Sequence, residues 1–225
     1  MSDEASGATA PRRWILIVLA CLAIAGLAFA IGRFSTFGAS ATSSPANDSA
    51  EAGFARDMQV HHAQAIEMAM QIYRTTDDTE LRTLAYDIAT GQSAQRGEMF
   101  DWLVQWGLPQ AGEPLMNWMA DADGGHSAHG GTAAEPLNDA ELSAAMGMAT
   151  DAQLAGLRAS TGSEADCLFL ELMIRHHEGA IPMTDAVLER GSVPRVLTVA
   201  TSMKSGQTAE IDAMKSLQSR LGCTG

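Results

Sequence analysis

The stretch "FLELMIRHHEGAIPM", residues 169–183, repeats an earlier stretch of the same chain, "FARDMQVHHAQAIEM", residues 54–68. Both carry Phe, Met, His-His, Ala-Ile and Met at the same places. In the earlier copy these residues recur at alternating steps of four and three, which is typical of a helix with one inward face. A helix turns about 100° per residue, so two adjacent histidines point in different directions.

The repeat extends well beyond the histidines. Sliding the sequence by 115 residues places 54–107 over 169–222 without a gap, with 14 identities in 54 positions. In the first copy, Asp77 with Glu80 predicts the start of a second helix, and Gly107 predicts its end. Each copy is therefore expected to be a helical hairpin. Two hairpins predict an all-α protein, a four-helix bundle in which each hairpin buries its apolar stripe.

The N-terminal part has a different composition. Residues 14–31 are an uncharged apolar run of 18 that follows two arginines. This run is long enough for a transmembrane helix with the rest of the chain outside the cytoplasm. The sequence "AFA", ending at Ala30, also fits signal-peptide cleavage, which would give a secreted protein. Residues 1–32 are thus a cytoplasmic tip with a transmembrane or signal helix.

The remaining domain organisation follows from composition. Residues 33–52 are small and polar and predict a flexible linker. Residues 53–225 form the expected bundle, in which an insertion, 108–168, separates the two repeats. Capping signals at Asn138 and at Thr150 with Gln153 predict two short helices in the insertion.

The insertion also carries a loose string of soft ligands, a second candidate metal site or a solvated loop. Its members are Met116, Met119, His126, His129, Met146 and Met148.

The cysteines suggest a covalent link. Cys167 precedes the third predicted helix and Cys223 follows the fourth, so an antiparallel hairpin brings them to the same end. In an exported protein this favours a disulfide between them. The alternative is two free thiols.

The overall charge and composition limit the function. The net charge is −13 and the pI about 4.7, which excludes a basic nucleic-acid-binding surface. The 13 methionines are either core filler or metal ligands.

The histidines indicate a metal site. If the hairpins are related by a twofold axis along the bundle, the first and third helices run parallel. His61, His62, His176 and His177 then meet at one level, with Met58 and Met173 one turn before them on the same face. Imidazole with thioether suits copper, particularly Cu(I), whereas zinc gains little from methionine.

Two alternatives remain open. The histidines could be structural core residues with Gln92 and Gln207 as hydrogen-bond partners. A di-iron oxidoreductase, the enzymatic alternative, needs Glu-x-x-His motifs, which this sequence lacks. Its carboxylates are also unsymmetrical, since Glu178 has no counterpart in the first copy. The sequence therefore favours a non-enzymatic metal binder over iron chemistry.

The segment "SEADCLFLELMIRHHEGAIPMTDAVL", with the upstream "FARDMQVHHAQAIEMA" and the "GQ" that follows each, resembles the bacterial family called domain of unknown function 305. The resemblance implies an exported, ferritin-like four-helix bundle associated with copper handling. Its motif adds Met68 and Met183, after the histidine pairs, to the candidate ligands. The first copy departs from the fuller motif, with Ala63-Gln64 where the second has Glu178-Gly179.

We therefore expect an extracytoplasmic protein that binds copper for tolerance, buffering or delivery. The sequence leaves open whether it forms a homo-oligomer and which metal-delivery partner it has.

Overall fold

The computed structural model describes residues 14–17, 21–29, 44–112, 114–119 and 137–223. The chain divides into two compact units, residues 1–44 and 45–225. In the first unit, residues 14–17 and 21–29 are helical. Among the described residues, none of the helices is both long enough and apolar enough to cross a membrane. Because part of the run 14–31 lies outside these residues, the membrane anchor stays a prediction.

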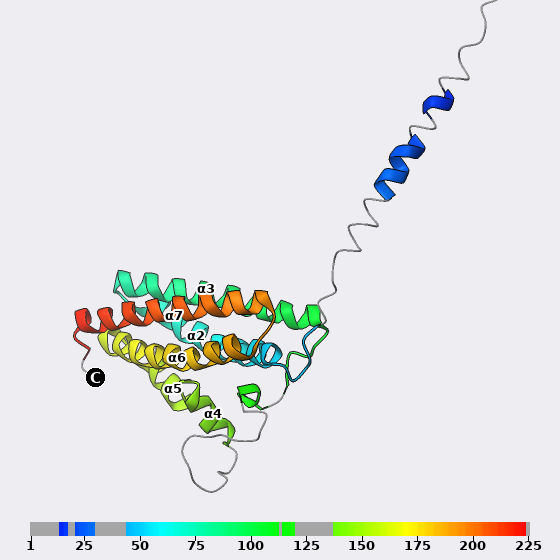
Figure 1. Cartoon of the computed structure of the whole chain (residues 1–225). Coiled ribbons are helices and arrows are strands. Elements are labelled where there is room, and N and C mark those ends of the chain that lie inside the picture. The colour runs from blue at the N-terminus through cyan, green and yellow to red at the C-terminus, as the bar shows by residue number, and fades with distance from the viewer. Residues whose placement is uncertain (1–13, 18–20, 30–43, 113, 120–136, 224–225) are drawn as a thin grey trace, which may run out of the picture. The chain divides into compact units, whose positions relative to one another are not determined.

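The second unit is built on four long helices, as predicted (Figure 1). They are α2 (Ala50–Thr75), α3 (Thr79–Trp106), α6 (Gly162–Arg190) and α7 (Pro194–Leu221). The insertion contributes three short elements, η1 (Asn117–Met119), α4 (Asp139–Ala145) and α5 (Asp151–Ala159). All regular structure within the described ranges is helical, which confirms the all-α fold class.

Local sequence signals set the ends of these helices. Ser49 caps α2, which begins at Ala50, before the expected end of the linker. Asp78 caps α3 by accepting the Leu81 N–H, so the predicted start at Asp77 is wrong by one residue. Gly107 ends α3 in the left-handed region, as does its repeat equivalent after α7.

The two predicted short helices are present in the insertion. Asn138 and Glu141 form a capping box at the start of α4. Thr150 and Gln153 form the second, at the start of α5. Each box satisfies two backbone N–H groups that a helix start leaves without partners.

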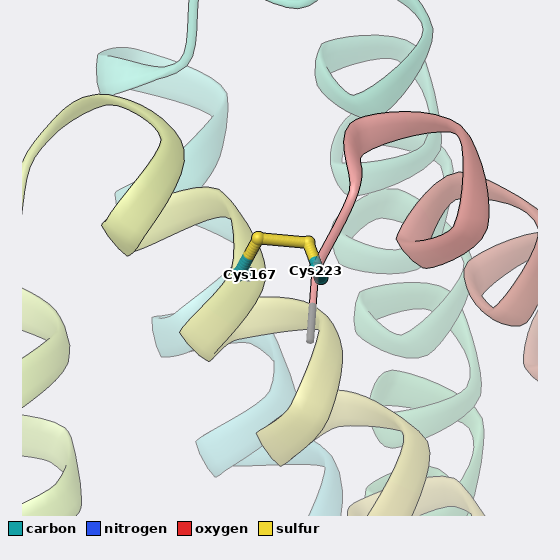
Figure 2. The surroundings of a disulfide bond; sticks show 2 residues. All are labelled: Cys167 and Cys223. Atoms are coloured by element: carbon teal, nitrogen blue, oxygen red, sulfur yellow. A yellow bond between two sulfur atoms is a disulfide. The ribbon is translucent and has the colours of Figure 1, made fainter. Parts of the chain in front are cut away.

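The predicted disulfide is confirmed. Figure 2 shows Cys167 on α6 bonded to Cys223, which follows α7, with a Cα–Cα distance of 5.4 Å. Because α6 and α7 are antiparallel, the start of one lies beside the end of the other. Cys21, in the first unit, is free and exposed.

The two hairpins pack with the opposite orientation to the one expected. Glu51, at the start of α2, accepts the backbone N–H groups of Ser192 and Val193, which follow α6. Arg220, near the end of α7, pairs with Asp78 at the start of α3. Helices α2 and α6 are therefore antiparallel, and the predicted parallel arrangement is wrong. The twofold axis that relates the two hairpins is perpendicular to the long axis of the bundle, not parallel to it.

A polar layer divides the bundle core into two apolar clusters. One cluster holds the second half of α2 and the first half of α6, with Met68 and Met173. The other holds the first half of α2 and the second half of α6, with Met58 and Met183. Between them lie six buried polar side chains, which we call the histidine layer: His61, His62, Gln92, His176, His177 and Gln207.

Candidate metal centre

One histidine from each pair faces the other hairpin. The rings of His61 and His176 lie with their centroids 3.7 Å apart and their planes tilted by 31°. Both side chains are fully buried. Within each helix the neighbouring rings diverge, with centroids 6.3 Å apart for His61 and His62. The adjacent imidazoles therefore serve different directions, as the sequence predicts.

The second histidine of each pair contacts the other helix of its own hairpin. His62 Nε2 lies 2.8 Å from Gln95 Oε1 on α3, and His177 Nε2 lies 2.6 Å from Glu210 Oε2 on α7. Gln95 and Glu210 occupy equivalent positions in the two repeats. A search for identical residues misses them because they differ, although the repeat alignment places one over the other.

The prediction that Gln92 and Gln207 are hydrogen-bond partners of the histidines is wrong. Both side chains are buried in the histidine layer, but among the described residues their amide atoms have no hydrogen-bond partner. A buried amide without a partner is costly. The layer therefore holds polar groups that its own hydrogen bonds leave unsatisfied.

Burial keeps three of the histidines, His61, His62 and His176, uncharged at neutral pH. It lowers the pKa of His61 to about 3 and that of His62 to about 4. The same cause holds the pKa of His176 well below its ordinary value of 6.5. A neutral imidazole is the form that binds a metal ion.

The hydrogen bonds also determine which ring nitrogen carries the proton. His61 Nε2 lies 3.0 Å from the Met146 carbonyl, which can only accept, so Nε2–H donates. His62 and His177 likewise direct Nε2 at an acceptor oxygen. In His61 and His62, which burial keeps neutral, the lone pair then lies on Nδ1. No Nδ1 atom of the four histidines has a hydrogen-bond partner in the described part of the chain.

The methionines flank the histidine layer on both sides. Met58 lies in one apolar cluster and Met173 in the other. The predicted arrangement, with both on one side, is wrong because α2 and α6 are antiparallel. Met58 instead shares its cluster with Met183, and Met173 shares its cluster with Met68.

A segment of the insertion, residues 146–149, covers the histidine layer, and we call it the cover segment. Besides the Met146 carbonyl at His61, its Ala149 exchanges two hydrogen bonds with the Gln64 side chain, of 2.7 and 2.9 Å. Gly179, the repeat equivalent of Gln64, lies directly beneath it: a Cβ there would stand 2.0 Å from the Met146 oxygen. The departure of the first repeat from the motif thus accommodates the cover segment.

A second part of the insertion packs near Met58. Asp57 Oδ2 accepts the Met116 N–H at 2.7 Å and the Trp118 Nε1–H at 2.8 Å. Burial raises the pKa of Asp57 despite these bonds. Of the predicted ligand string, Met146 is buried, and Met116, Met119 and Met148 are partly buried against the same cluster as Met58. His126 and His129 lie outside the described residues.

Unlike Glu210, the carboxylates of Glu67 and Glu178, which follow the histidine pairs in the sequence, lie away from the histidines. Glu178 pairs with Lys215 at 2.9 Å and Glu67 with Arg158 at 2.7 Å, both at the surface. Among the residues that the structure describes, no group of three or more His, Cys, Asp or Glu side chains is placed to hold a metal ion. The core donors that fit a metal are imidazole Nδ1 and thioether sulfur, a soft set suited to Cu(I).

The chain belongs to the family called domain of unknown function 305 (DUF305), whose model matches residues 51–218. It is similar to a DUF305 protein from Streptomyces coelicolor, described as secreted, with 39% identity over 80% of this chain and 98% of that one and a TM-score of 0.68. A DUF305 fragment from Deinococcus radiodurans is 32% identical over 76% and 96% of the two chains, with a TM-score of 0.61. No curated protein matches the chain.

A more distant structure of the same fold is CopM in a Cu(II)-bound form. It is 26% identical over 76% of this chain and 97% of that one, with a TM-score of 0.56. The same protein is also known in Cu(I)-bound and silver-bound forms.

Proposed function

We propose that this protein binds copper, as Cu(I), in the histidine layer, and that it serves copper tolerance, buffering or delivery outside the cytoplasm. His61 and His176 would hold the ion from the two hairpins. His62 and His177, with the thioethers of Met68 and Met173 that flank the layer on one side, complete the soft donor set.

The observation that carries the proposal is the set of buried Nδ1 atoms. Four fully buried imidazoles lie in one layer, and their Nδ1 atoms have no hydrogen-bond partner among the described residues. Leaving buried polar atoms unpaired destabilises a fold, so a ligand that satisfies them is favoured. Glu210, hydrogen-bonded to His177, would orient that ring and increase its basicity, as carboxylates beside metal-binding histidines do.

The test is an anaerobic Cu(I) titration of the purified full chain, with elemental analysis. We expect the variant His61→Ala with His176→Ala to lose at least one equivalent of tightly bound copper. The matched control, His126→Ala with His129→Ala, removes the same number of imidazoles and is expected to keep it. Unchanged copper stoichiometry in the first variant would contradict the proposal.

The same preparation separates the alternatives. A di-iron oxidoreductase would contain iron after aerobic purification and turn over oxygen. A structural role for the histidines predicts no metal uptake, together with a loss of thermal stability in His177→Leu or His62→Leu. Copper uptake without iron supports the binder over both.

We also propose that the protein is exported from the cytoplasm. The Cys167–Cys223 disulfide suits an oxidising compartment, and the Streptomyces coelicolor relative is described as secreted. Residues 14–31 would be either a membrane anchor or a signal peptide cleaved near Ala30. Mass spectrometry of the N-terminus of the exported protein distinguishes these two outcomes.

A further inference from the structure

The apolar cluster around Met58 contains an unusual concentration of sulfur. Each of the four long helices contributes one buried methionine to it: Met58, Met99, Met183 and Met203, which we call the methionine layer. A fifth, Met146 of the cover segment, is also fully buried there. Thus every element packed around this half of the core supplies a thioether.

The contacts of the histidine layer fix the level of these residues along the bundle. His62 contacts Gln95 across the antiparallel α2–α3 pair, and Met58 and Met99 lie four residues from these two on the same side. The contact of His177 with Glu210 likewise brings Met183 and Met203 to one level. The facing pair His61 and His176 aligns the two hairpins to within about one helical turn.

The opposite half of the core provides an internal comparison. The repeat equivalents of the methionine layer are Met173, Met214, Met68 and Ile88, all buried in the other cluster. Isoleucine there fills the position of Met203. An apolar core needs no sulfur at this position, and the complete set of four methionines occurs in the half of the core that also holds Met146.

Partly buried methionines lead from the surface to this cluster. Met116, Met119 and Met148 are partly buried and pack against the cluster of the methionine layer. They belong to the two parts of the insertion that seat on α2 through Asp57 and Gln64. Thioethers therefore continue from the protein surface to the buried layer.

We propose that the methionine layer, with Met146, is a second binding site for a soft monovalent metal ion, Cu(I) or Ag(I), held by thioether sulfur alone. It is distinct from the histidine layer and does not depend on it. Thioethers bind soft ions and do not titrate, so neither proton release nor an imidazole is required at this site.

The experiment uses Ag(I), a redox-inert probe, with the full chain labelled at its methionine methyl groups with ¹³C. On titration we expect the methyl resonances of Met99 and Met203 to shift. The variant Met99→Leu with Met203→Leu keeps the core volume and should bind one equivalent fewer than the wild type. The control, Met214→Leu, changes the repeat equivalent of Met99 in the opposite half of the core and should retain that equivalent.

Two results would overturn the inference: unshifted Met99 and Met203 resonances at saturating Ag(I), or equal uptake by the wild type and Met99→Leu with Met203→Leu. The labelled wild type decides the question even if that variant fails to fold. The variant His61→Ala with His176→Ala separates the two sites. If it still shifts Met99 and Met203, the methionine layer binds independently, whatever becomes of the histidine proposal. If those shifts vanish with the histidines, the layer is not a separate site.

Discussion

Gly179 is where the structure makes its sharpest stability prediction. In Gly179→Ala the new Cβ would lie 2.0 Å from the Met146 oxygen and 2.2 Å from its carbonyl carbon. Both are backbone atoms, so the cover segment has to move away from α6. The displacement breaks the Met146–His61 hydrogen bond and the two Gln64–Ala149 hydrogen bonds.

The magnitude follows from these three bonds. At about 1 kcal/mol each they represent about 3 kcal/mol of the free energy of unfolding. Alanine is favoured over glycine in a helix by about 1 kcal/mol, which offsets part of the loss. The expected net destabilisation is about 2 kcal/mol, or a decrease in Tm of roughly 4–8 °C for a domain of this size.

The assay is urea unfolding of the metal-free protein, with Gly206→Ala as the matched control. Gly206 lies within α7, and a Cβ added to it would have no atom of the described residues within 4 Å apart from the neighbouring residues and backbone of its own helix. The same substitution there should stabilise the protein by roughly 0.5–1 kcal/mol. If Gly179→Ala is as stable as the wild type or behaves like the control, the cover segment is not held by this close approach.

The remaining predictions concern pH and the disulfide. Burial lowers the pKa of His61 to about 3 and that of His62 to about 4, whereas the ordinary pKa of histidine is 6.5. Below pH 6.5 these two side chains therefore bind more protons in the unfolded chain than in the native one. The free energy of unfolding is therefore unaffected by these histidines above pH 6.5 and falls as the pH decreases toward 3. At pH 5 the loss is about 2 kcal/mol per histidine. Urea midpoints between pH 7 and 5 should show this decrease, with a shallower dependence in His62→Leu; an equal dependence in that variant would contradict the assignment. The disulfide spans 56 residues, so in the chain-entropy model Cys223→Ser loses about 4 kcal/mol. Thermal unfolding should show this loss but little change in Cys21→Ser, and equal Tm values for the two variants would count against it.

The sequence predicts the parts of the bundle better than their assembly. The helices, the capping boxes, the disulfide and the divergence of adjacent histidines all depend on local patterns or on the repeat. The hairpin orientation does not, because an internal repeat is compatible with a twofold axis along or across the bundle, and the inward stripe is the same in both.

The deciding contacts lie at the ends of the helices. Glu51 binds the turn after α6, and its repeat equivalent Asp166 has Thr76, which follows α2, as a hydrogen-bond partner. Burial by itself would raise the pKa of Glu51, but its hydrogen bonds outweigh this and lower it. Each of these two buried carboxylates, near the start of α2 or α6, is hydrogen-bonded to the turn that follows the other helix. Both contacts can form only if α2 and α6 are antiparallel. The spacing of the carboxylates is visible in the sequence, but their burial is not.

The candidate site is also only partly predictable. The four histidines follow from the repeat, whereas the roles of Gln95, Glu210 and the cover segment depend on hairpin register and on an insertion outside the repeat. Gln64 and Gly179 differ for a structural reason, since one binds the cover segment and the other makes room for it. Glu178, specific to the second copy, pairs with Lys215 at the surface.

The most direct test of the histidine layer is Cu K-edge X-ray absorption on the full chain loaded anaerobically with one equivalent of Cu(I). Nitrogen and sulfur neighbours in the wild type, with the nitrogen contribution lost in His61→Ala with His176→Ala, are the predicted result. A spectrum with oxygen neighbours only, or a nitrogen contribution unchanged in that variant, would contradict copper binding by the histidine layer.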